Sequence, residues 1–355
     1  SLLNITGLTI GITCSLFLLM YILHELSYDR YHENAPNIYR VVSNIKETDN
    51  AFTWAVAQIP LAEELRDNYP EVKNAVRFFD TGRTLYKNGD KQFYEEEFYL
   101  ADSTVFEMFT YPFLYGDPNT ALDNPFSLVL TEKTALKYFP DVSAAMGSSI
   151  QNQGGEEFKI TGIMKDVPLN SHFIFDGLIS RNTRPDYNSG WGNFGVFTYV
   201  HLPEGYELTK MYTSLDSVIK QKVNPIFEQY GIIIKYELQP ILDIHLYSKI
   251  QDEAEAGGDI SYIFIFASVA VFMLIIACIN YMNLATARSA NRAREVGVRK
   301  VMGSQRRQII AQFITESVVI ALIALVVSMI LIYALLPAFN TLANKSIPFS
   351  FILQG

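Results

Sequence analysis

Three long stretches without charged residues constrain this sequence more than any other feature. Leu2–Leu23 and Ile260–Ala287 contain no charged residue at all, and Ile309–Leu336 contains only Glu316. About 20 consecutive apolar residues are enough for a helix to cross the roughly 30 Å hydrocarbon core of a bilayer. Buried helices of soluble proteins rarely stay uncharged over such lengths. The sequence therefore predicts three membrane-spanning helices.

The charges beside these stretches predict the orientation of the chain. The segment between the second and third stretches carries seven basic residues and a single acid, Glu295. Short basic loops stay on the cytoplasmic side of a membrane. Residues 25–259, which hold 35 acidic and 20 basic residues, are then expected outside the cytoplasm. We predict a multi-pass protein of the bacterial cytoplasmic (inner) membrane with a large periplasmic domain.

The ends of the sequence and its two cysteines give further expectations. The chain opens on Ser1-Leu2-Leu3 without the basic start of a signal peptide, and no small-x-small cleavage site follows. We expect a missing cytoplasmic lead, and at least one further span after Gly355. Cys14 and Cys278 fall inside predicted spans, where small apolar packing is favoured over a metal or redox role.

Residues 25–259 show the periodicity of an α+β domain. Two strand–helix–strand units, one near each end of the domain, enclose an inserted β-rich subdomain. The fold class is thus a membrane α-helical region joined to an α+β extracytoplasmic domain. The first unit is expected as strand 37–43, helix 54–68 and strand 72–79, followed by a hairpin with an Asn88-Gly89 turn; the second as strand 196–202, helix 208–229 and strand 232–238; and the insert as helix 131–138 and strand 158–163.

These expectations divide the chain into consecutive segments. They are a first span at 1–24, the exterior domain at 25–259 with its insert at about 98–184, a second span at 260–287, a cytoplasmic loop at 288–308, a third span at 309–336 and an exterior segment at 337–355.

No motif in this sequence predicts an active site. His24-Glu25 lacks the second histidine of a zinc-protease helix, and no Gly-x-Ser-x-Gly elbow occurs. His172 and His201 lie in turn or strand surroundings, where a structural role is favoured. The sequence has no Gly-Lys dipeptide and hence no P-loop. We expect no catalytic residue, cofactor or metal in this chain, and ATP with Mg²⁺ in a partner ATPase.

One segment resembles the signature of the FtsX/MacB family of ABC permeases. It runs from Ala277 to Ile310 and contains Arg294-Glu-Val-Gly-Val-Arg-Lys. Glu316-Ser317 stands where that family has a Glu-Ser pair. Further segments similar to the opening and the exterior core domain of these permeases are Asn4–Gly11, His24–His32 and Phe158–Phe173.

The resemblance implies that the basic segment is the coupling element that touches the ATPase subunit. Its charges, small apolar residues and glycines suit a short amphipathic element that docks into a groove, while a helix lying on the membrane surface is the alternative. Asn280, Asn283 and Glu316 are predicted polar residues near the inner membrane boundary. The predicted coupling residues are Arg292, Arg294, Glu295, Val296, Gly297, Val298, Arg299, Lys300 and Gly303.

The sequence thus predicts a permease subunit of an ABC-type efflux or mechanotransmission complex. The expected partners are a cytoplasmic ABC ATPase, a second permease copy or a paired permease, and membrane lipids. A periplasmic adaptor or an outer-membrane channel is a further candidate, and no nucleic-acid binding is expected. Two alternatives stay open: a membrane-anchored sensor, and an FtsX-like regulator of cell-wall hydrolases that moves no solute.

Overall fold

A computed structural model describes residues 2–186, 190–301 and 306–351 and divides the chain into two compact units. Ser1–Ser27 and Asp259–Gly355 form a helical unit, and Tyr28–Gly258 forms an α+β unit. The first unit contains the residues of the three predicted spans, and the second lies within the predicted exterior domain.

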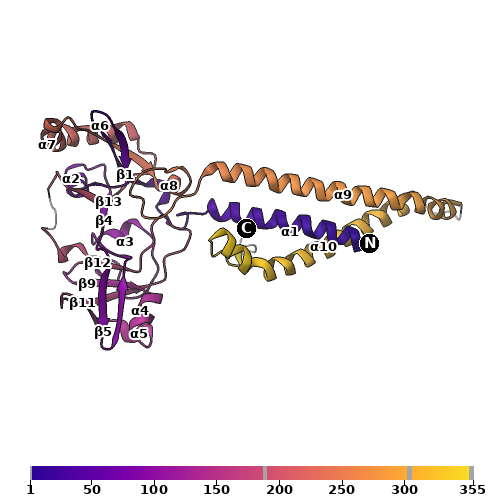
Figure 1. Ribbon diagram of the computed structural model, residues 1–355, viewed down its shortest axis with the longest axis horizontal. Helices are drawn as coiled ribbons and strands as arrows, with labels where there is room; N and C mark the ends of the chain where they lie inside the picture. Colours follow the sequence, from indigo (N-terminus) through magenta and orange to yellow (C-terminus); the bar gives the residue numbers. More distant parts are fainter. Residues whose placement is uncertain (1, 187–189, 302–305, 352–355) are drawn as a thin grey trace. The chain divides into compact units, whose positions relative to one another are not determined.

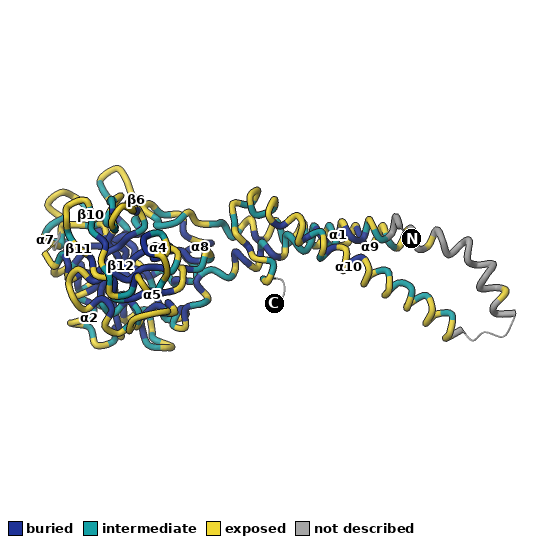
Figure 2. The backbone as a smooth tube through the Cα atoms, turned by 90° about the horizontal axis from the view of Figure 1, so that it is seen from below, coloured by how far each residue is buried: buried dark blue, intermediate teal, exposed yellow. Residues whose placement is uncertain are grey.

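The helical unit contains three long helices, α1 (Leu2–Glu25), α9 (Ile260–Val301) and α10 (Arg306–Ala343) (Figure 1). Each is long and apolar enough over part of its length to cross a membrane. Much of the surface of α9 and α10 is exposed in Figure 2, although it is apolar. Such faces suit contact with lipid, and the three predicted spans are confirmed.

Two of these helices extend beyond their predicted spans. α9 continues without interruption to Val301, so the predicted loop at 288–308 is helical over most of its length. No proline occurs in α9, and Gly297 is its one glycine, so little in the sequence would end the helix earlier. α10 continues through Pro337 to Ala343. The predicted exterior segment at 337–355 therefore begins as a helix.

The end of α10 and the residues after it fold back on the helical unit. Asn340 forms two hydrogen bonds with the backbone of Ile347, at 3.0 and 3.2 Å. Ile347 packs in a buried cluster with Met20 of α1 and with Ile332 and Leu336 of α10. This cluster joins α1, α10 and the C-terminal segment.

The α+β unit is built on one mixed sheet of 14 strands within its described residues. Four strands lie in the order β14-β1-β13-β4, and each neighbouring pair is antiparallel. Each strand–helix–strand unit therefore has a strand of the other unit between its own two strands, as in split βαβ folds. The bounds are β1 Ile38–Lys46, β4 Asn74–Asp80, β13 Phe194–His201 and β14 Ile233–Pro240.

Helices α2 (Leu61–Asn68) and α6 (Leu208–Val218) connect these strands and share one hydrophobic core with them. Leu65 of α2 and Leu215 of α6 are both buried in that core. Helical structure continues after α6 as a π-helical turn at Ile219–Val223, α7 at Asn224–Phe227 and a 3-10 turn at Glu228–Tyr230, which confirms the predicted helix at 208–229.

The insert extends the sheet from β4 in the order β7-β12-β9-β11-β10-β5-β6. Aromatic and branched side chains of these strands form a further core with α4 and α5. The bounds are β5 Thr84–Asn88, β6 Lys91–Glu95, β7 Phe98–Ala101, β9 Ser127–Thr131, α4 Glu132–Tyr138, α5 Val142–Ala145, β10 Ser149–Asn152, β11 Glu157–Met164 and β12 Gly177–Ser180.

Smaller elements complete the unit. They are a 3-10 turn at Ala35–Asn37, β2 Ala51–Trp54, β3 Ala57–Gln58, α3 Val105–Met108, β8 Phe113–Tyr115, a 3-10 turn at Arg181–Thr183 and α8 Ile241–Tyr247.

Two local predictions were wrong in detail. The helix predicted at 54–68 begins only at Leu61, because Pro60 disfavours helical backbone at Ile59 and the residues before it pair as β2 and β3. In the hairpin, Asn88 pairs with Lys91, so the two-residue turn is Gly89-Asp90 and not Asn88-Gly89. Gly89 takes the positive φ, at 58°.

Candidate functional site

The predicted coupling residues belong to a helix and not to a loop. Eight of them, from Arg292 to Lys300, lie in the last turns of α9. Val298, whose side chain is described, is 56% exposed. Gly303 lies outside the described residues. A continuous helix thus carries the basic residues away from the apolar part of α9, and their contact with an ATPase stays a prediction.

The predicted boundary residues lie on two helices. Asn280 and Asn283 are exposed on α9, and Glu316 is half-buried on α10. Asn280 also packs closely against α1, because a Cβ atom added to Gly7 would lie 2.6 Å from its Nδ2 atom. The structure thus brings Asn280 to the α1–α9 interface, a contact that the sequence did not predict.

Small residues let α1 approach α9 closely. A Cβ atom on Gly11 would lie 2.4 Å from the Cβ atom of Ala277, a distance that no real pair of carbons tolerates. Gly7 and Gly11 are four residues apart on α1, the spacing that brings small residues to one helix face in membrane interfaces. Ser15 Oγ also donates a hydrogen bond to the carbonyl of Ala270, at 3.1 Å.

Hydroxyl groups hold α1 against α10 as well. Ser328 Oγ donates to the carbonyl of Thr9 at 3.0 Å, and Thr9 Oγ1 lies 3.5 Å from the carbonyl of Ala324. In hydrocarbon, polar groups must find such partners within the protein. α1 is therefore the central helix of this unit and contacts both longer helices.

An ion pair lies at the outer end of α1. Lys345 Nζ is 2.6 Å from Glu25 Oε1, and the Glu25 side chain is 2% exposed. A carboxylate this buried is stable when a charged partner compensates for lost hydration. The pair ties the segment after α10 to the last turn of α1.

A buried polar cluster follows α1 in the chain and belongs to the α+β unit. His172 Nε2 lies 2.8 Å from the hydroxyl of Tyr199, and His172 Nδ1 lies 2.9 Å from Asp29 Oδ1. The backbone N–H of His172 also donates to Asp29, and Tyr31 bonds Ser171 at 2.7 Å. Asp29, Ser171, His172 and Tyr199 are buried and Tyr31 is half-buried, so the cluster stabilises the fold.

This cluster joins two segments that carry the family resemblance. Asp29 and Tyr31 come from the segment after the first span, and Ser171 and His172 from the exterior segment that ends at Phe173. Sequence reasoning assigned His172 a structural role, which its burial supports, but did not pair it with Asp29. The one sequence feature that could have suggested this pairing is that both segments contain polar residues among aromatic ones.

A second buried charge anchors the residues that precede α9. Arg40 on β1 is fully buried, and its guanidinium lies 2.5 and 2.8 Å from the two carboxylate oxygens of Glu253. Gln239 on the neighbouring strand accepts a further bond at 2.7 Å. Such a bidentate pair has fixed geometry as well as charge. It fixes the segment just before Ile260 to the central sheet.

The described residues show no group of three or more histidine, cysteine or acidic side chains that could hold a metal ion. Cys14 is half-buried and Cys278 is exposed, both on helices of the helical unit.

Comparison with known proteins adds sequence and fold relatives. Residues 1–216 match the MacB-like periplasmic core domain, and residues 267–355 match the FtsX-like permease C-terminal region. Over 78 residues the chain is 39% identical to the macrolide export ATP-binding/permease protein MacB of Campylobacter jejuni, covering 22% of this chain and 12% of that protein. Over 201 residues it is 27% identical to the ABC transporter permease YknZ of Bacillus subtilis, covering 55% of this chain and 45% of that protein.

One solved structure shares the fold of the α+β unit. A domain of a permease protein from Porphyromonas gingivalis aligns with a TM-score of 0.53 and 20% identity, covering 59% of this chain and 91% of that domain. At this identity the likeness shows the fold alone. The matched regions span less than half the length of the curated relatives named above.

Proposed function

This chain belongs to the FtsX/MacB family of ABC-type permeases, and on that premise we propose that it transmits the motion of a separate ATPase subunit to its periplasmic α+β unit. Family membership makes it an inner-membrane permease component that works with an ABC ATPase. Our proposal is that the motion passes from the ATPase to the periplasmic unit.

The uninterrupted course of α9 carries this proposal. At 1.5 Å per residue, its 42 residues extend about 63 Å, roughly twice the thickness of a bilayer core. The apolar part, Ile260–Asn283, accounts for the crossing, and the remainder extends into the basic region. A continuous helix moves as one body, so a displacement at the basic end reaches Ile260 without loss at a hinge.

An ion pair inside the α+β unit, seven residues before α9 begins, supports transmission into the sheet. Arg40 holds Glu253, which shortly precedes the helix, against β1. Breaking a buried ion pair leaves an uncompensated charge and costs several kcal/mol, about 3 to 5. A pull on this segment is therefore passed to the central strands before the pair gives way.

The proposal assigns ATP hydrolysis to the partner, with the last turns of α9 as its contact surface. It also assigns a second permease copy to the complex. Efflux, sensing and regulation of cell-wall hydrolases share the requirement for a rigid connection and differ in what the periplasmic unit contacts. For any of these outcomes we propose mechanotransmission as the mechanism, because the long continuous helix and the ion pair before it serve it directly.

A kink in α9 tests the proposal. Thr286 is exposed just beyond the apolar part of the helix, and its hydroxyl bonds the carbonyl of Met282 at 2.8 Å. Thr286→Pro removes a backbone hydrogen bond and kinks the helix, whereas Thr286→Ala removes only the hydroxyl bond. An ABC ATPase subunit is first sought by copurification with the full-length chain, and both variants are then co-expressed with it and reconstituted in lipid nanodiscs.

The readout is the distance between spin labels on the α+β units of two copies, with and without ATP. We expect an ATP-dependent change in the Thr286→Ala complex, and a loss of at least half of that change in the Thr286→Pro complex with ATP hydrolysis retained. An equal change in both complexes would show that α9 does not carry the motion.

Assembly with the ATPase is tested separately, because a kink in α9 should reduce the ATP-dependent motion, whereas a lost contact should reduce copurification of the ATPase. Gly297→Trp places a large side chain in the predicted coupling surface, and Glu295→Lys reverses its single acidic charge. We expect both to reduce copurification of the ATPase, while Thr286→Pro does not. Intact assembly and ATP-coupled motion in both coupling variants would overturn the assigned contact surface.

A further inference from the structure

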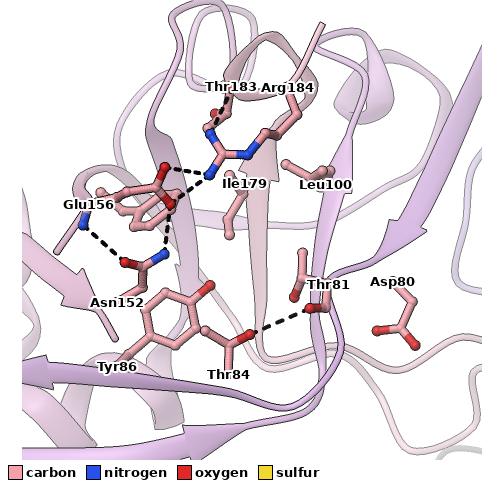
Figure 3. A pocket seen from close by; sticks show the side chains of 11 residues that line it. Asp80, Thr81, Thr84, Tyr86, Leu100, Asn152, Glu156, Ile179, Thr183 and Arg184 are labelled. Carbon is pink, nitrogen blue, oxygen red and sulfur yellow. Dashed lines mark hydrogen bonds and ion pairs between the residues drawn. The ribbon is translucent and has the colours of Figure 1, made fainter. Parts of the chain in front are cut away.

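A cavity of about 230 Å³ lies in the inserted part of the α+β unit, apart from every contact used above. It opens between the end of β4, the strands β5, β7, β10, β11 and β12, and the turn after β12, and we call it the insert pocket (Figure 3). Its lining residues are Asp80, Thr81, Thr84, Tyr86, Leu100, Asn152, Glu156, Phe158, Ile179, Thr183 and Arg184.

The floor of the insert pocket is apolar. Leu100, Phe158 and Ile179 are all at least nine-tenths buried, and they line the cavity from three different strands. At roughly 30 Å³ for each water-sized group, the cavity has room for about eight such groups. The floor therefore offers an apolar surface against which a small hydrocarbon group can pack.

Tyr86 places one polar atom in these apolar surroundings. The residue is 2% exposed, and its ring packs against those of Phe98 and Phe158, with centroids 4.8 and 5.8 Å away. No described residue forms a hydrogen bond with its hydroxyl group, which Figure 3 shows directed into the pocket. The hydroxyl oxygen keeps contact with the open space of the pocket, where water or a bound molecule can form a hydrogen bond with it.

The mouth of the insert pocket carries more negative than positive charge. Arg184 binds Glu156 with its Nη2 atom 2.5 and 2.6 Å from the two carboxylate oxygens, and this contact lowers the pKa of Glu156. Asn152 donates a further bond to Glu156 at 2.8 Å. Asp80 stands exposed at the same mouth. Arg184 thus neutralises Glu156, and Asp80, whose Oδ1 atom accepts a hydrogen bond from the Gly82 N–H at 2.7 Å, gives the mouth its net negative charge.

We propose that the insert pocket binds a small amphipathic cation, consisting of a primary ammonium group beside a carbonyl and a short branched apolar group. The apolar group packs on Leu100 and Ile179, the carbonyl accepts a hydrogen bond from Tyr86, and the ammonium group lies at the acidic mouth. A free amino-acid amide and the N-terminus of a peptide share this chemistry. The site is independent of the proposed transmission function and adds ligand recognition to the periplasmic unit.

The test uses the full-length chain in nanodiscs and L-leucinamide as the probe, with binding followed by saturation-transfer NMR titration. N-acetyl-L-leucinamide keeps the apolar group and the amide and lacks the positive charge. We expect saturable binding of L-leucinamide, and at least tenfold weaker binding of the acetylated compound. Equal affinity of the two compounds, or no saturable binding of L-leucinamide up to 50 mM, would overturn the proposal.

Variants locate the binding site. Tyr86→Phe removes only the hydroxyl group, and we expect about fivefold weaker binding, as for one neutral hydrogen bond. Ile179→Trp fills the floor and should abolish binding, while Glu204→Gln, an exposed acid outside the pocket, serves as the control. Because Ile179→Trp can disturb the core, its thermal unfolding is measured beside that of Tyr86→Phe. Unchanged binding by Tyr86→Phe would place the ligand elsewhere.

The two sources of the ligand are distinguished by peptide probes. Leu-Ala-Ala amide is compared with its N-acetylated form and with free L-leucinamide. Tighter binding of the free-amine peptide than of L-leucinamide identifies a peptide N-terminus as the ligand, whereas weaker binding identifies a small free amine. Binding of the acetylated peptide as tightly as the free-amine peptide would contradict the role of the ammonium group.

Discussion

Burial determines the charge of His32 beside the polar cluster at the start of the α+β unit. Its Nδ1 atom accepts a hydrogen bond from the backbone N–H of Thr110 at 3.0 Å, which requires a neutral ring nitrogen at that position. Desolvation lowers the pKa of His32 to about 3, although Asp29 opposes the shift. The folded protein therefore keeps this ring neutral over the physiological range.

A pH dependence of stability follows from that shift. The folded pKa lies below the unfolded value, so below about pH 6.5 the unfolded chain gains a proton that the folded chain does not, and stability falls as the pH falls. Between pH 6.5 and pH 5 this group should account for a loss of up to about 2 kcal/mol.

The measurement is urea unfolding of the full-length protein in detergent, followed by the fluorescence of Trp54 and Trp191, both in the α+β unit. His32→Asn keeps an acceptor for the Thr110 N–H and removes the ionisable ring. We expect the variant to lose less stability than the wild type over this interval. Parallel pH curves for the two proteins would show that His32 does not titrate as described.

At the scale of elements, the packing of α1 against α9 depends on the absence of a side chain. Gly11→Ala would bring two methyl carbons to 2.4 Å, so the helices must separate. Overpacking of this kind costs typically about 1 to 3 kcal/mol. We expect a lower thermal unfolding midpoint for Gly11→Ala in detergent, measured by circular dichroism.

A compensating substitution gives the control. Ala277→Gly removes the opposing methyl group. The double variant with Gly11→Ala and Ala277→Gly should therefore unfold at a higher temperature than Gly11→Ala alone. Additive losses in the double variant would show that the two residues do not meet.

The elements differ in how far the sequence predicts them. The three spans were predicted from the lack of charged residues, which is a local property of the sequence. Periodicity predicted the helix after Gly205 and the strands β1 and β14. α2 was predicted too long, because the helical pattern of Val56 and Ile59 continued across Pro60, whereas Ala57 and Gln58 between them pair with β13. Strand order depends on contacts between residues far apart, so β13 between β1 and β4 could not be read from either unit alone.

The candidate site divides in the same way. The basic segment was found from its composition and from its resemblance to a family, and both depend on consecutive residues. The pairing of Asp29 with His172 joins positions 143 residues apart and leaves no periodic signal. The insert pocket leaves no periodic signal either, because its walls come from several strands.

At the scale of the whole molecule, the charges on either side of the spans predict opposite accessibility. Val298 and Asp117 are both exposed, one near the basic end of α9 and one in the α+β unit. With Cys14 and Cys278 replaced by alanine, a cysteine at position 117 should react with a membrane-impermeant maleimide in spheroplasts, and a cysteine at position 298 only after lysis. Labelling of position 298 before lysis would reverse the orientation.

The interleaving of the strands also limits when this protein can fold during its synthesis. β1 emerges early, yet both of its neighbours in the main order, β13 and β14, come from the far end of the unit. Until β14 has crossed the membrane, β1 has open edges, and open strand edges invite pairing with other chains. α9 begins shortly after β14, at Ile260. Closure of the sheet therefore coincides with insertion of the second span, and a pause in translation before Ile260 would leave an aggregation-prone intermediate in the periplasm.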